Sequence, residues 1–110
     1  PWRNYLNLGV LHAELNMIPE AMQWFKRAIE ANKQSSLAHL ALASSLHKLG
    51  RPKQAGEVYR EARRLELQEE SPNVQVIARI KTAIDDCNLA LEEAENAHIA
   101  SATKPGTTVT

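Results

Sequence analysis

The sequence predicts an all-α fold, an α-solenoid of two stacked helical hairpins followed by one long C-terminal helix. Three observations predict it. Apolar and small residues recur at a fixed offset of 34 positions, and their spacing within each unit is helical. After the second unit the period stops and a heptad pattern replaces it. The recurring pairs are Leu6 and Leu40, Leu8 and Leu42, Leu15 and Leu49, Ala21 and Ala55, Phe25 and Tyr59, and Ala28 and Ala62.

The first hairpin is predicted to consist of helices over 2–15 and 19–33. In the first of these, Leu8, Leu11 and Leu15 share one stripe of a helix. Asn16 is suited to the left-handed conformation that ends many helices, and Pro19 is favoured in the first turn of the next helix. The segment between the two helices is therefore a short break.

The second hairpin repeats this punctuation, with helices predicted over 36–49 and 53–69. Ser35 is placed to cap the start of the hairpin, and Gly50 and Pro52 separate its two helices. Ser71 and Pro72 are expected to cap a fifth helix over 72–99. The tail 101–110 has Pro, Gly and Thr without periodicity, and we expect it to be disordered.

The fifth helix carries apolar residues at alternating steps of three and four, which is a heptad seam. It is nearly twice as long as each repeat helix. We expect its first half, up to Cys87, to cover the open face of the last hairpin. The second half either overhangs in solvent or makes a coiled-coil contact with another copy or another subunit. The candidate residues for this helix-mediated interface are Ile84, Cys87, Leu91, Ala94 and His98.

The formal net charge is zero, with 13 basic and 13 acidic residues, but the C-terminal part is acidic. One interpretation of these acidic residues is that they form an ordinary solvated face. The other is that they form an acidic surface that meets a basic one, such as Arg60, Arg63 or Arg64 of a neighbouring copy. That interaction would weaken in high salt. The acidic residues in question are Asp85, Asp86, Glu92, Glu93 and Glu95.

Several classes of function are disfavoured by the residues. The sequence has no glycine-rich phosphate loop, no HExxH motif and no glycine-flanked serine, so we expect no catalytic site and no cofactor. Cys87 is the only cysteine and the four histidines are dispersed, so no metal site is expected. The basic cluster of Arg60, Arg63 and Arg64 shares its helical turns with Glu57 and Glu61. This interleaving favours ion pairs within a helix over nucleic-acid binding. No apolar run approaches the roughly 20 residues that span a bilayer, so we expect no membrane insertion.

Units 2–35 and 36–69 resemble tetratricopeptide repeats, a family with a 34-residue consensus. The proline usual near the end of each repeat is absent, and His39 and Ala43 stand where Trp and Gly are usual. The resemblance implies hairpins stacked in a right-handed solenoid and a non-enzymatic protein-binding scaffold over 1–100. The matching residues are Tyr5, Leu8, Gly9, Leu15, Ala21, Phe25 and Ala28, then Leu42, Leu49, Gly50, Ala55, Tyr59 and Ala62.

The resemblance further implies that the first helix of each hairpin lines a concave groove for a partner. Leu6, Val10 and Ala41 replace the Lys and Asn that hold carboxylates in some members, so the groove suits a partner helix or hydrophobic strip. Alternatively, Leu6, Val10, Leu37 and Leu40 pack against an upstream repeat or the fifth helix. The groove residues implied by position are Arg3, Leu6, Asn7, Val10, Ala13, Glu14, Leu37, Leu40, Ala41, Ser44, His47 and Lys48.

The chain starts at Pro1, and we expect it to be the C-terminal end of a longer array. Its expected function is a protein–protein interaction scaffold in an intracellular, cytoplasmic setting. Two alternatives remain open: a substrate-positioning appendage of a larger enzyme, and an oligomerisation module that uses helix 72–99.

Overall fold

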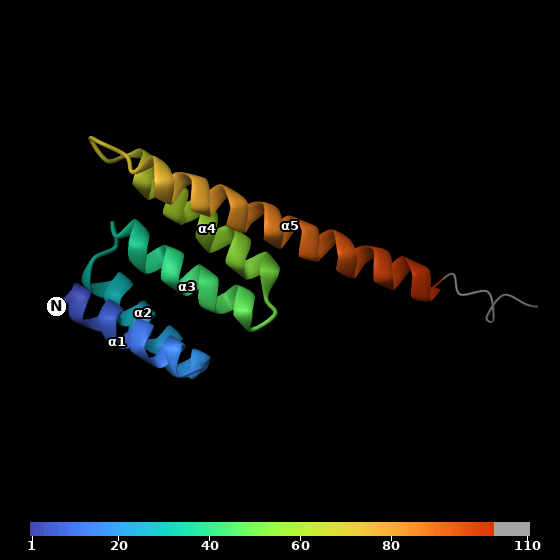
Figure 1. The fold of residues 1–110 in the computed structure, drawn as a ribbon, viewed down its shortest axis with the longest axis horizontal. Coiled ribbons are helices and arrows are strands. Elements are labelled where there is room, and N and C mark those ends of the chain that lie inside the picture. The colour runs from blue at the N-terminus through green and yellow to red at the C-terminus, as the bar shows by residue number, and fades with distance from the viewer. Residues whose placement is uncertain (103–110) are drawn as a thin grey trace, which may run out of the picture.

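The structure, a computed structural model, describes residues 1–102 and consists of five helices over that range. Helices α1 (Trp2–Glu14) and α2 (Ile18–Ala31) form the first hairpin, and α3 (Ser36–Lys48) and α4 (Pro52–Leu67) form the second. Helix α5 (Val74–Ala102) lies against α4 and then continues past the hairpins (Figure 1). The predicted all-α solenoid with a long C-terminal helix is confirmed.

The breaks between the helices have the backbone conformations that their residues predict. Asn16 has a φ of 60° and Gly50 a φ of 76°, so both lie in the left-handed region where Asn and Gly are favoured. The Ser35 hydroxyl accepts a hydrogen bond from the Ala38 backbone N–H at 3.1 Å and caps α3. Asn16 and Gly50 therefore turn the chain at the same phase of the two hairpins, and Ser35 marks the start of the second.

Small residues bring the helices of the hairpins close together. A Cβ added at Gly9 would overlap the ring of Phe25, so α1 approaches α2 too closely for any larger residue there. Five alanines at the recurring positions have no exposed surface, which confirms that small side chains permit the close packing of helices. These alanines are Ala21, Ala28, Ala43, Ala55 and Ala62.

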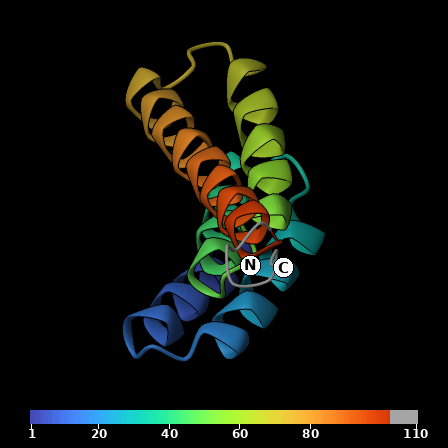
Figure 2. The same ribbon diagram turned by 90° about the vertical axis from the view of Figure 1, so that its right-hand side faces the viewer.

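The main core runs from α2 through α3 and α4 to α5. Ile18 and Met22 contribute from α2, Leu46 from α3 and Tyr59 from α4, and α5 completes the cluster. Figure 2 shows the first hairpin at the bottom, the second above it, and α5 at the top beside α4. The fifth helix therefore covers the last hairpin, as a capping helix does.

The start and end of α5 differ from the prediction. The helix begins at Val74, because the Asn73 side chain accepts hydrogen bonds from the backbone N–H groups of Gln75 and Val76, at 3.0 and 3.2 Å. Asn73, rather than Ser71, is therefore the capping residue. At the other end the helix includes Ser101 and Ala102, which the sequence assigned to a tail. The rest of that expected tail, 103–110, lies outside the described residues.

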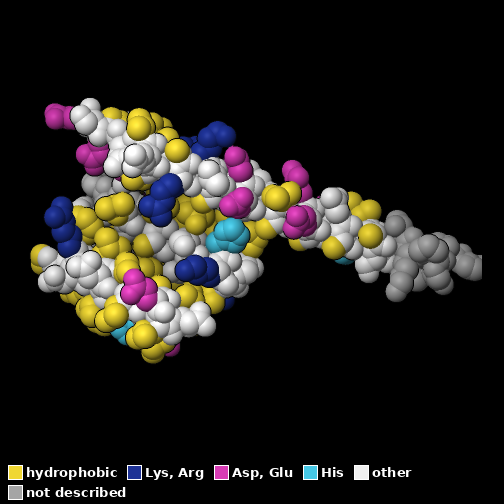
Figure 3. Space-filling model, in the orientation of Figure 1, with side chains coloured by type: hydrophobic (Ala, Val, Ile, Leu, Met, Phe, Trp, Pro, Cys, Tyr) yellow, Lys and Arg dark blue, Asp and Glu magenta, His cyan; other side chains and the backbone are white. Residues whose placement is uncertain are grey.

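The two halves of α5 have different surroundings. Ile80, Ile84 and Cys87 are buried against the second hairpin. From Leu91 to Ala102 every residue is exposed. We call this segment, residues 91–102, the arm. Figures 1 and 3 show it projecting from the body of the molecule.

Candidate protein-binding groove

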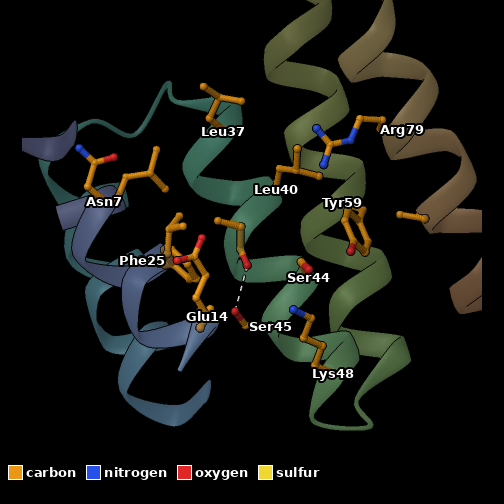
Figure 4. Close-up of a pocket in the computed structure, with 15 residues that line it drawn as sticks. Asn7, Glu14, Phe25, Leu37, Leu40, Ser44, Ser45, Lys48, Tyr59 and Arg79 are labelled. Carbon is orange, nitrogen blue, oxygen red and sulfur yellow. Dashed lines mark hydrogen bonds between the residues drawn. The ribbon is translucent and has the colours of Figure 1, made fainter. Parts of the chain in front are cut away.

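A groove of about 490 Å³ lies between α1, α3 and α5 on one face of the hairpins (Figure 4). Its floor includes the buried rings of Phe25 and Tyr59. Its rim includes Val10 and Leu37, which are 42% and 47% exposed, large fractions for apolar side chains. The groove is lined by Leu6, Asn7, Val10, Ala13, Glu14, Phe25, Leu37, Leu40, Ala41, Ser44, Ser45, Lys48, Tyr59, Arg79 and Ala83.

Ten of the twelve residues that the resemblance placed in the groove line it. They come from α1 and α3, the first helices of the two hairpins. Within each helix most of them are three or four positions apart, and residues with that spacing share one face of a helix. These ten are Leu6, Asn7, Val10, Ala13, Glu14, Leu37, Leu40, Ala41, Ser44 and Lys48.

Arg3 and His47 are not among the lining residues. The Arg3 guanidinium lies over the Trp2 ring, 5.2 Å from its centroid. The His47 Nδ1 lies 3.8 Å from the Cys87 Sγ of α5. His47 is therefore part of the contact between α3 and α5, and its inclusion in the groove is corrected.

Helix α5 contributes Arg79 and Ala83 to the groove, and the repeat pattern alone did not place them there. Figure 4 shows the Arg79 side chain reaching from α5 toward the side of the groove that holds Leu40 and Tyr59. In the sequence, the one indication that Arg79 could reach the groove was its position next to Ile80, a seam residue of α5. Using this indication would have required knowing how α5 crosses α3 and α4.

The groove has more positive than negative charge. Its lining includes Lys48 and Arg79 against one carboxylate, Glu14. Within residues 1–102 the ion pairs are Arg64–Glu61 and Lys81–Asp85, so neither Lys48 nor Arg79 is paired there. Both cations are available to an acidic group of a ligand.

The apolar part of the lining determines what else the groove accepts. The exposed Val10 and Leu37 and the half-buried Leu6 and Leu40 present apolar surface to solvent. Covering such surface is favourable by roughly 25 cal/mol per Å². The groove therefore offers apolar surface together with positive charge.

Cys87 is buried where α5 meets α3 and α4. Burial raises the pKa of its thiol, and the neighbouring Asp86 raises it further. A protonated, inaccessible thiol is a poor nucleophile, so this residue belongs to the core. Burial likewise raises the pKa of the Tyr59 hydroxyl in the same region, while an interaction with Ser44 lowers it by less.

The residues predicted for an interface on the fifth helix fall into two groups. Ile84 and Cys87 are buried inside this chain, which removes them from any surface between molecules. Leu91, Ala94 and His98 lie on the arm and are exposed. Arg64, which the sequence suggested as a partner for acidic residues of a neighbouring copy, instead pairs with Glu61 of its own helix at 2.6 Å, and the Arg64 guanidinium lowers the pKa of that carboxyl.

The described residues hold neither a metal-binding cluster nor a membrane-spanning helix. No cluster of three or more histidine, cysteine or acidic side chains within 1–102 is arranged to bind a metal ion. None of the helices in that range has the length and apolar character of a membrane span.

The sequence profile of a family described as "Tetratricopeptide repeat" matches residues 3–35 and again residues 37–68. The two matched segments coincide with the two hairpins that form the groove. No curated protein matches the chain. Repeats of this kind are generally protein–protein interaction modules and are typically non-catalytic. The chain belongs to the tetratricopeptide-repeat family.

Proposed function

We propose that this chain is a protein-binding scaffold whose groove between α1, α3 and α5 holds a helix or strip of a partner protein. The observation that supports this most directly is the groove itself, with exposed Val10 and Leu37 beside Lys48 and Arg79, two cations that have no ion pair within the described residues 1–102. Partner helices bind to apolar grooves through side chains spaced along one face.

The mixed lining indicates the kind of partner. Lys48 and Arg79 project from different helices, α3 and α5, so they favour acidic side chains spread along a segment. Leu6, Val10 and Ala41 replace the Lys and Asn of the carboxylate-binding members, so a terminal carboxylate is not the expected anchor. The partner segment therefore has an apolar face flanked by acidic residues.

The test requires substitutions that alter the groove without unfolding the chain. Val10→Glu with Leu37→Glu introduces two carboxylates at exposed groove positions. The matched control is Leu11→Glu with Leu67→Glu, since these leucines are 52% and 56% exposed and lie outside the groove. Equal thermal stability of the two double variants establishes that both fold.

A photo-crosslinking amino acid at position 37 captures what occupies the groove in cells, and the same group at position 11 is the control. The captured protein is then purified and titrated against the three chains. We expect the groove variant to bind at least about tenfold more weakly than wild type, a loss of roughly 1.4 kcal/mol, and the control to bind as wild type does. Equal affinity for all three chains would refute the proposed groove.

A further inference from the structure

The arm is a helical segment whose side chains are exposed from Leu91 to Ala102. Helix α5 has 29 residues, whereas its neighbour α4 has 16. At 1.5 Å per residue, the arm extends roughly 18 Å. The face that buries Ile80, Ile84 and Cys87 on the body continues along it to Leu91, which is 38% exposed.

The arm is apolar and acidic on one side. At 3.6 residues per turn, Leu91, Glu92 and Glu95 fall within a sector of about 100°. The arm carries Glu92, Glu93 and Glu95 and no lysine or arginine. Figure 3 shows acidic and hydrophobic side chains along the projecting part of α5. This is the chemistry that the proposed function assigns to the partner of the groove.

The groove has the complementary character. Lys48 and Arg79 are unpaired within residues 1–102, and Glu14 is the one acidic residue in the lining. Val10 and Leu37 supply apolar surface between the charges. Helix α3, which forms one wall, has 13 residues, and the arm has nearly the same length.

Contact between two arms is disfavoured by charge. Pairing two arms through the side that carries Leu91 would bring Glu92 and Glu95 of both chains together with no lysine or arginine from either arm, and like charges at close range destabilise an interface. The arm cannot reach the groove of its own chain, because α5 is one continuous helix that leads away from it (Figure 1).

We propose that the arm of one copy of this chain occupies the groove of a second copy, with Glu92 and Glu95 facing Lys48 and Arg79. This inference rests on the proposed function and names its partner as a second copy. When each chain inserts its arm into the other, the exchange closes a two-fold dimer with two identical contacts. The groove then binds other proteins only in competition with the arm.

The test exchanges charges between the two surfaces in the full chain. One variant carries Lys48→Glu and Arg79→Glu, which makes its groove acidic. The other carries Glu92→Lys and Glu95→Lys, which makes its arm basic. All four positions are exposed, so both variants are expected to melt as wild type does. Sedimentation velocity measures self-association of each protein alone and of an equimolar mixture.

We expect the wild-type chain to form a dimer that weakens with added salt, and each variant alone to associate at least about tenfold more weakly. The equimolar mixture should restore the dimer, because each arm then meets a groove of opposite charge. A monomeric wild type, or a dimer that both variants retain, overturns the proposal. Variants that dissociate while their mixture stays monomeric also overturn it.

The two proposals fail in different ways. If the wild-type chain is monomeric while Val10→Glu with Leu37→Glu still abolishes binding of a crosslinked partner, the proposed function stands and the second copy is excluded. If this groove variant changes neither partner binding nor dimer formation, both proposals fall.

Discussion

The Glu66 carboxylate accepts a hydrogen bond from the Ser36 hydroxyl at 2.6 Å, joining the end of α4 to the start of α3. Its other oxygen accepts the backbone N–H of Asn73 at 2.9 Å, in the segment that leads into α5. Both Ser36 and Glu66 are buried. One carboxylate therefore ties the second hairpin to the start of the capping helix.

Replacing Glu66 by alanine removes both hydrogen bonds and leaves the buried Ser36 hydroxyl without its acceptor. We expect the free energy of unfolding to fall by about 2–3 kcal/mol, since buried hydrogen bonds to charged groups have that magnitude. Urea titration followed by circular dichroism measures the change. The exposed Glu69→Ala is the control and should lie within about 0.5 kcal/mol of wild type. Similar losses in both variants would contradict the role given to Glu66.

Two buried glycines in helices should respond in opposite ways to alanine. At Gly9 the added Cβ overlaps the Phe25 ring, so we expect a loss of about 1–3 kcal/mol from overpacking. At Gly56 the nearest atom is the flexible end of Arg60, 3.4 Å away, so the higher helix propensity of alanine should stabilise by up to about 1 kcal/mol. Thermal melts of the two variants test this, and a stabilising Gly9→Ala would show that α1 and α2 can separate without loss.

The two halves of α5 should differ in their contribution to stability. Ile84→Ala opens a cavity in the core, and we expect a loss of about 2–4 kcal/mol. Leu91→Ala on the arm should change the free energy of unfolding of the monomer by less than about 0.5 kcal/mol. Chemical denaturation at low protein concentration makes the comparison. A large loss at Leu91 under those conditions would mean that the arm packs within its own chain.

The chain should lose stability at alkaline pH. Burial raises the pKa of Cys87 above its ordinary 9.0, so the unfolded thiol ionises before the folded one. The contribution of Cys87 is therefore fully present below about pH 9 and is lost as pH rises through the higher folded pKa. Tyr59, raised above 10.0 by burial, adds a second loss at higher pH.

Urea midpoints measured from pH 7 to pH 11 test this expectation. The Cys87→Ala variant should lack the earlier part of the decline and keep the part due to Tyr59. If its stability falls with pH as wild type does from pH 9 onward, the thiol is not the source. Alkylation of Cys87 in the native chain at neutral pH should also be slow and should accelerate in urea, because the thiol is buried and protonated.

The hairpins were predictable because their signals are local. Asn16 and Gly50 specify left-handed turns, and Ser35 specifies a helix start, through interactions within a few residues. The 34-residue period also indicates which faces of the helices meet. Gly9, Ala21 and Ala28 are followed 34 positions later by small residues, and these are the places where helix backbones approach each other. The same repeat positions identified most of the groove, because α1 and α3 each present one face to it.

Only the tertiary structure decided how α5 crosses the second hairpin. The heptad seam runs unbroken from Ile77 to His98, so the sequence does not mark where burial ends, yet packing buries Cys87 and leaves Leu91 exposed. The same crossing brings Arg79 into the groove and draws His47 away from it toward Cys87. Helical periodicity depends on neighbours along the chain, whereas the position of a helix over its neighbours depends on side chains far apart in sequence. For that reason the sequence determined the repeats, and packing determined the charge of the groove and the length of the arm.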